Sequence, residues 1–226
     1  MDKQSRSVRR ISESDGAGLG VRTSVTPTIR PVDQVDPGVA GNARLTGAAG
    51  AVIFVVLAVE GVTVLRVHSM LTLHIFVGMV LVPVAVLKTL STGYRFVRYY
   101  RGDETYVRKG APPMALRIIG PFVAVLTLVV LGTGIAAASV GPGTWLMQAH
   151  KASFILWFGA TTVHVLGHIL ETPALAVADW RPSTRRVAPG APLRLWLLLG
   201  ALVAGVVLAL ATRNLGDGWH QFGKFG

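Results

Sequence analysis

Residues 149–168 read AHKASFILWFGATTVHVLGH and decide how the rest of the chain is interpreted. The segment is apolar enough to cross a bilayer, yet it carries three histidines. His150 and His164 lie about 40° apart around a helix and about 21 Å apart along its axis. His168 follows His164 by one turn and lies on the same face. Polar side chains inside a bilayer are costly and usually functional, so this segment predicts a site within a membrane helix.

The composition of the whole chain also indicates a membrane protein. Of its 226 residues 51% are apolar, and the net charge of +11 comes from residues outside the apolar runs. No nucleic-acid-binding motif accompanies that charge, so we expect no nucleic-acid partner. The chain contains no cysteine, which excludes disulfides and iron–sulfur clusters bound by its own thiolates.

Five apolar segments are each long enough to span a membrane as a helix. They cover approximately residues 45–65, 71–90, 114–138, 148–170 and 195–212. The predicted fold is therefore all-α, a multi-pass transmembrane helical bundle. Its first four helices form a four-helix core over residues 43–172, and a fifth transmembrane helix covers residues 194–213.

Polar segments complete the predicted domain organisation. Residues 1–42 contain too few apolar side chains to pack and are predicted to be a disordered tail. Residues 173–193 form a basic loop, and residues 214–226 form a short tail. Lys and Arg gather in the first tail and in the long loops after the second and fourth spans. The positive-inside rule therefore puts the N-terminus in the cytoplasm and the C-terminus outside, with the basic loops against anionic lipid headgroups.

A second histidine lies at the depth of His150. The second and fourth spans both enter the membrane from the outer side, and His74 is the fourth residue of the second span. Two neutral imidazoles from neighbouring helices can bind a haem iron, one on each face. Fourteen residues after His74 comes Lys88, level with His164, where a symmetric site for two haems would have a histidine.

Glycines on the first and third spans repeat the same spacing. Gly47 and Gly61 are fourteen residues apart, as are Gly120 and Gly134. Gly61 and Gly134 fall at the level of His74 and His150, whereas Gly47 and Gly120 fall at the level of Lys88 and His164. A flat cofactor between helices requires small residues where the backbones approach it closely.

This pattern resembles the four-helix haem-binding unit of the cytochrome b family over about residues 45–170. The resemblance implies that His74 and His150 bind the iron of an outer haem b. It also implies that His164 is one ligand of a second, inner haem. The sequence departs from the family at the position of the other ligand, where Lys88 stands instead of a histidine, and Lys88 and His168 are the candidates for that role. Residues 91–100 resemble a segment of small bacterial membrane proteins of this kind, which implies a bacterial inner membrane.

The expected function is electron transfer between the membrane, with quinone as a carrier, and a partner redox protein. We expect no flavin or nicotinamide domain, because no such segment is present in the sequence. The chain is thus expected to be an electron-transfer subunit of an oxidoreductase rather than a stand-alone enzyme. In that role the protein would supply ligands, orientation and a dry setting for the cofactor.

Two other function classes stay open at this stage. In a metal-ion transporter or sensor, His164 and His168 would bind a divalent ion from one helix face. In a structural membrane subunit, the histidines would only form hydrogen bonds. Glu60 also has two interpretations: it accepts protons from a quinol at the outer face, or it pairs with Arg66 or Lys151.

The charge distribution makes a prediction about topology. A reporter enzyme that is active only outside the cytoplasm should work when it is fused after Gly226 and fail when it is inserted at Asp103. Activity measured in intact cells checks this, with immunoblots to show that both fusions are made. The reverse pattern would invert the assignment of the two membrane faces.

Overall fold

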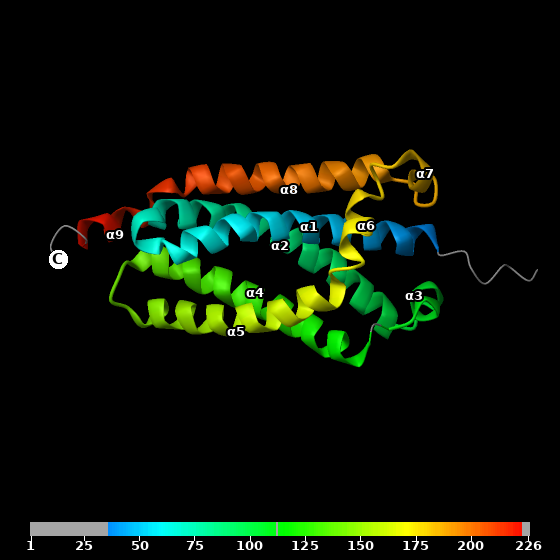
Figure 1. The fold of residues 1–226 in the computed structure, drawn as a ribbon, viewed down its shortest axis with the longest axis horizontal. Helices are drawn as coiled ribbons and strands as arrows, with labels where there is room; N and C mark the ends of the chain where they lie inside the picture. Colours follow the sequence, from blue (N-terminus) through cyan, green and yellow to red (C-terminus); the bar gives the residue numbers. More distant parts are fainter. Residues whose placement is uncertain (1–35, 112, 223–226) are drawn as a thin grey trace, which may run out of the picture. The chain divides into compact units, whose positions relative to one another are not determined.

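A computed structural model describes residues 36–111 and 113–222 of the chain (Figure 1). Every regular element in these residues is a helix, so the predicted all-α class is confirmed for the part of the chain that is described. Four helices are long and apolar enough to cross a membrane, and they indicate a membrane protein. These are α1 (Pro37–Leu65), α2 (Val67–Tyr100), α4 (Met114–Val140) and α8 (Ala191–Ala211).

The remaining predicted span, α5 (Trp145–His168), forms a 24-residue helix but does not match these four in hydropathy. Its three histidines and Lys151 lower its mean hydropathy, and the histidines are the residues that marked it as a site. Its outer surface is nevertheless apolar, because Ile155 and Phe158 are 69% and 60% exposed. A surface of this kind suits lipid better than water.

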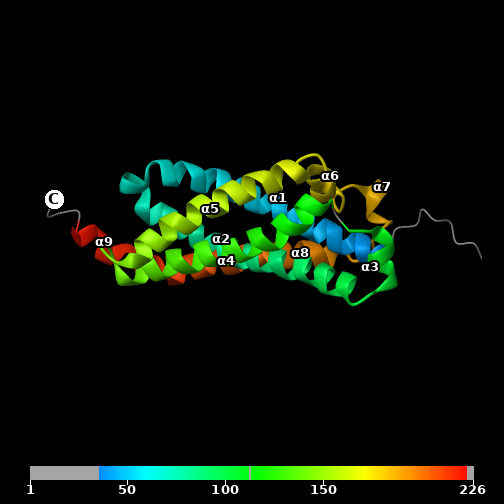
Figure 2. The same ribbon diagram turned by 90° about the horizontal axis from the view of Figure 1, so that it is seen from below.

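The geometry of the bundle shows how α5 runs. Arg44 near the start of α1 and Arg194 near the start of α8 both bond Asp179, so these two helices start at the same end. Since α1 runs away from that end, the three long helices that follow it, α2, α4 and α5, must bring the chain back there before α8 begins. α5 does so alongside α4, and the α4–α5 hairpin lies on one side of α1, α2 and α8 (Figures 1 and 2). If the four apolar helices cross a membrane, α5 crosses it with them.

Several predicted boundaries differ from the structure. α1 begins at Pro37, because the Asp36 carboxylate accepts hydrogen bonds from the backbone N–H groups of Gly38 and Val39 and caps the helix. Residues 37–42 are therefore helical and not a disordered tail, while residues 1–35 lie outside the described part. α2 continues ten residues beyond the predicted end at residue 90, into what was expected to be a loop.

Short helices occupy the other segments that were predicted to be irregular. α3 (Glu104–Lys109) follows α2. The basic loop at residues 173–193 contains most of α6 (Thr172–Val177) and all of α7 (Pro182–Arg185). The C-terminal segment forms η1 (Arg213–Gly216) and α9 (Asp217–Phe222). These elements are too short for the hydropathy pattern to reveal, and their bounds depend on local caps and turns.

A buried ion cluster holds one end of the bundle together. Asp179, between α6 and α7, is 6% exposed and receives Arg44 Nη1 at 3.0 Å and Arg194 Nε at 2.6 Å. Arg194 Nη2 adds a second bond, at 2.7 Å, to the same carboxylate. Burial raises the pKa of Asp179, but the hydrogen bonds from Arg194 and Arg44 outweigh it and leave the pKa below its usual value.

Removing the Asp179 charge should destabilise the protein strongly. Asp179→Asn leaves two buried guanidinium groups without their counter-ion, which costs about 3–5 kcal/mol in comparable sites. Thermal unfolding of the purified protein in detergent, followed by circular dichroism, measures the loss. Asp217→Asn, at an exposed site, is the control and should unfold at the wild-type temperature.

The difference in stability between wild type and Asp179→Asn should also depend on pH. Because the folded-state pKa of Asp179 is lowered, its stabilisation is fully present above the unfolded value of about 3.9. It is lost as the pH falls through the lowered folded pKa. Wild type and Asp179→Asn should therefore converge in stability in acid and differ most near neutral pH. An equal difference in stability in acid and at neutral pH would show that the ion cluster is not the source of the difference.

Candidate functional site

His74 of α2 and His150 of α5 lie beside each other within the bundle. Their ring centroids are 6.3 Å apart and the ring planes are inclined by 61°. The two helices themselves belong to different parts of the fold, because α2 packs mainly on α1 and α8 while α5 packs mainly on α4. The two side chains thus meet across the boundary between the α1–α2 pair and the α4–α5 hairpin.

The Nδ1 atom of each ring is held by a group on the preceding helix of its own hairpin. His150 Nδ1 donates a hydrogen bond to the backbone carbonyl of Val130 at 3.0 Å, and Thr133 Oγ1 lies 3.4 Å away. His74 Nδ1 lies 2.9 Å from Glu60 Oε1 and 3.3 Å from Thr63 Oγ1. The Val130 carbonyl oxygen can only accept, so Nδ1 carries the proton in His150. An ionised Glu60 carboxylate would accept from Nδ1 of His74 in the same way.

The opposite nitrogen, Nε2, is consequently the one with the lone pair in each neutral imidazole. Within the described residues, no hydrogen bond engages Nε2 of either His74 or His150. Histidines that ligate metals show the same arrangement, because a second partner on the far nitrogen fixes the tautomer and the ring orientation. The two rings therefore form a pair of oriented donors from two hairpins.

Glu60 has a different partner from those that the sequence suggested. We expected a pair with Arg66 or Lys151, or a role toward quinol. The pair with Arg66 or Lys151 does not form in the described residues, because the Glu60 carboxyl group contacts His74 and lies 2.9 Å from Thr63 Oγ1. Glu60 and His74 face each other because both lie on the sides of α1 and α2 that pack together. Thr63 is 1% exposed and seals this contact.

Hydroxyl groups that the sequence analysis did not single out support the His150 half of the pair. Thr133 Oγ1 lies 3.3 Å from Ser153 Oγ, and Trp157 Nε1 donates to Thr127 Oγ1 at 2.9 Å. Both contacts join α4 to α5, and they fix the rotation of α5 on which the direction of His150 depends. Hydrogen bonds of this kind are common between membrane helices. The hydroxyl groups of Thr127, Thr133 and Ser153 were therefore a sequence signal for the faces on which α4 and α5 pack together.

The four predicted glycines do not share one role. Gly134 lies under the His150 ring, since a Cβ there would be 2.9 Å from His150 Cε1. Gly47 instead makes room for α6, because its Cβ would lie 2.6 Å from Leu175 Cβ. Gly61 and Gly120 have no such neighbour within 4 Å. Gly134 is therefore the one of the four that the structure places against a site histidine.

The inner histidines have a different arrangement. His164 and His168 lie on one helix with ring centroids 4.9 Å apart, and His164 Nδ1 is buried without a hydrogen-bond partner in the described residues. Lys88 Nζ points to the α1 backbone, 3.4 Å from the Thr46 carbonyl oxygen. Among the side chains that the structure describes, none from another helix brings a second imidazole to face His164.

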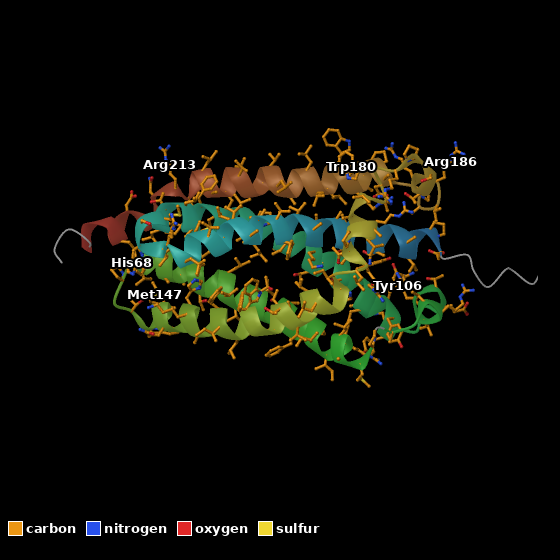
Figure 3. The ribbon with its side chains drawn as sticks, in the orientation of Figure 1. His68, Tyr106, Met147, Trp180, Arg186 and Arg213 are labelled. Carbon is orange, nitrogen blue, oxygen red and sulfur yellow. The ribbon has the colours of Figure 1, made fainter. Side chains whose placement is uncertain are left out.

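No group of three or more His, Cys, Asp or Glu side chains that could hold a metal ion occurs in residues 36–111 and 113–222. The exposed His68 lies with Met147 at the end of the bundle opposite Tyr106 and Arg186 (Figure 3).

Comparison of the chain with protein-family models, curated proteins and solved structures found no match.

The contact of Gly134 with His150 gives a matched pair of variants. Gly61→Ala adds a methyl group where nothing lies within 4 Å and improves helix propensity, worth up to about 1 kcal/mol. Gly134→Ala gains the same propensity but pushes on an imidazole that is held by Val130. We expect Gly61→Ala to unfold at or above the wild-type temperature and Gly134→Ala to unfold below Gly61→Ala. Equal effects of the two substitutions would contradict the close approach of the His150 ring.

Proposed function

We propose that this chain is a b-type cytochrome of a bacterial inner membrane, in which His74 and His150 bind one haem iron. The observation that carries the proposal is the facing pair of imidazoles, each with Nδ1 hydrogen-bonded and Nε2 left with its lone pair. The function would be transfer of single electrons between the membrane, with quinone as a carrier, and a partner redox protein.

The donor set fits a haem iron. A metal–imidazole bond is about 2 Å long, so one metal between two Nε2 atoms separates them by about 4 Å. The centroid separation of 6.3 Å is compatible with this spacing when both Nε2 atoms point at the metal. Two neutral imidazoles are also an established axial donor set for haem in helical bundles.

The number of donors favours haem over a bare metal ion. A divalent ion such as zinc takes three or four ligands from the protein, and the described residues contain no cluster of that size. A haem iron receives four nitrogens from its porphyrin and needs only two more donors. This argues against the metal-transporter alternative. The structural-subunit alternative leaves unexplained why neither Nε2 atom has a hydrogen-bond partner among the described residues.

The chain would contribute ligation, orientation and exclusion of water. His74 and His150 supply the axial nitrogens, and the acceptors on α1 and α4 keep those nitrogens unprotonated. The surrounding helices exclude solvent and lower the dielectric constant at the site. The bound haem supplies the one-electron chemistry.

The proposal is for one haem. Within the described part of the chain, His164 has no imidazole facing it from another helix, and Lys88 Nζ is directed at the backbone of α1. His164 and His168 project from one face of the same helix, so they cannot bind opposite faces of one haem.

Removal of either axial histidine should abolish the haem. His74→Ala and His150→Ala each take away one of two iron bonds, so each purified protein should lose the reducible Soret band. Wild type should contain about one haem per chain by pyridine haemochrome assay. Lys88→Met should keep that content, and His68→Ala, at an exposed site of the same bundle, is the control.

Three results would refute the proposal. One is a wild-type protein without haem when it is produced in cells well supplied with haem. Another is a wild-type spectrum in both histidine variants. The third is loss of haem from His68→Ala to the same extent as from His74→Ala. Membrane insertion of each variant is checked by immunoblot, which separates loss of ligand from loss of the protein.

A further inference from the structure

The two imidazoles of the site have chemically different supports. His74 Nδ1 faces a carboxyl group, with Glu60 Oε1 at 2.9 Å, whereas His150 Nδ1 donates to the neutral carbonyl of Val130 at 3.0 Å. A hydrogen bond to an ionised acceptor is roughly twice as strong as one between neutral groups. The two histidines are therefore not equivalent, although they have the same residue type and lie at the same depth.

From this asymmetry we infer that Glu60 is a positioning residue that sets the tautomer of His74 and lowers the reduction potential of the iron bound there. The inference rests on the proposed function. It adds a residue that would not touch the cofactor and acts through a ligand.

The Glu60 carboxyl group has a polar neighbour at each of its oxygens. Oε1 faces His74 at 2.9 Å, and Oε2 lies 2.9 Å from the Thr63 hydroxyl, which shares its one proton between Oε2 and the Glu60 backbone carbonyl at 2.7 Å. The side chains of His74 and Glu60 are only 21% and 13% exposed, so water screens the contact weakly. Thr63 lies one turn after Glu60 on α1, and its hydroxyl lies within hydrogen-bond distance of both the carboxyl group and the His74 ring. Such fixed geometry is required of a group that orients another side chain.

The electronic consequence follows from charge. A carboxylate that accepts the Nδ1 proton raises the electron density and basicity of the ring, which strengthens its bond to the metal. The ferric state carries one more positive charge than the ferrous state, so a nearby anion stabilises the ferric state more. The reduction potential falls as a result. Val130 exerts no such pull on His150, because a backbone carbonyl carries no net charge.

The experiment is a redox titration of Glu60→Gln. The glutamine side-chain oxygen can still accept from Nδ1, so the ring stays oriented and haem stays bound, but the negative charge is gone. We expect the equilibrium constant for reduction to rise by about tenfold or more, which is about 59 mV for one electron. The low-spin ferric electron paramagnetic resonance signal should shift as well, because the axial ligand field changes.

Glu104→Gln is the matched control, since it removes the same charge from an exposed residue of α3. Its midpoint potential and resonance spectrum should stay at the wild-type values. Glu60→Asp keeps the anion, and it should restore haem and a low potential if Glu60→Gln binds haem poorly.

The outcomes separate this inference from the proposed function. Glu60→Gln with full haem content and a wild-type potential overturns the role of Glu60 alone. Loss of haem in both Glu60→Gln and Glu60→Asp also overturns it, because Glu60 would then serve only to pack the helices. A wild-type protein without haem refutes the cytochrome function itself.

Discussion

A membrane helix must find partners for its polar side chains within the protein, because the hydrocarbon offers none. That constraint determines how these helices are rotated about their axes. α4 and α5 are aligned by the contacts of Trp157 with Thr127 and of Thr133 with Ser153. α1 and α2 are aligned by Glu60 and His74. Once these pairs are formed, the directions of the two site histidines are fixed as well.

The buried ions near Asp179 impose the second constraint. Exchanging a buried ion pair for apolar groups often costs little, whereas leaving one charge alone is expensive, so such clusters define an arrangement more than they add stability. Here the cluster requires α1 and α8 to begin at the same end of the bundle. That requirement makes α5 a full-length return helix even though its hydropathy is modest.

The helices and the depth of the site histidines could be predicted from the sequence, and the partners of those histidines could not. Hydropathy locates α1, α2, α4 and α8, because each contains an apolar run of membrane length. The helical repeat places His74 level with His150. The bond from Glu60 to His74, however, depends on how α1 and α2 are turned toward each other.

Other features depend on contacts between distant parts of the chain. Arg44 and Asp179 are 135 residues apart, and the sequence around either residue does not indicate that the two form an ion pair. Gly47 was assigned to the cofactor level from its fourteen-residue spacing to Gly61, whereas in the structure it makes room for Leu175 of α6, a helix that the sequence did not reveal. The α2 extension beyond residue 90 was missed because hydropathy gives a charged helical segment the same low value as a polar loop. Arg98 lies 5.8 Å from the Tyr94 ring centroid and 5.9 Å from that of Tyr106, which gives this extension a folded polar end.

The division of the site between two helical hairpins has a consequence for biogenesis. His74 is satisfied by Glu60 within the α1–α2 hairpin, and His150 is satisfied by Val130 within the α4–α5 hairpin. Each hairpin can therefore satisfy the Nδ1 atom of its own histidine before the other hairpin has been made. The partner of each imidazole does not depend on association of the two hairpins.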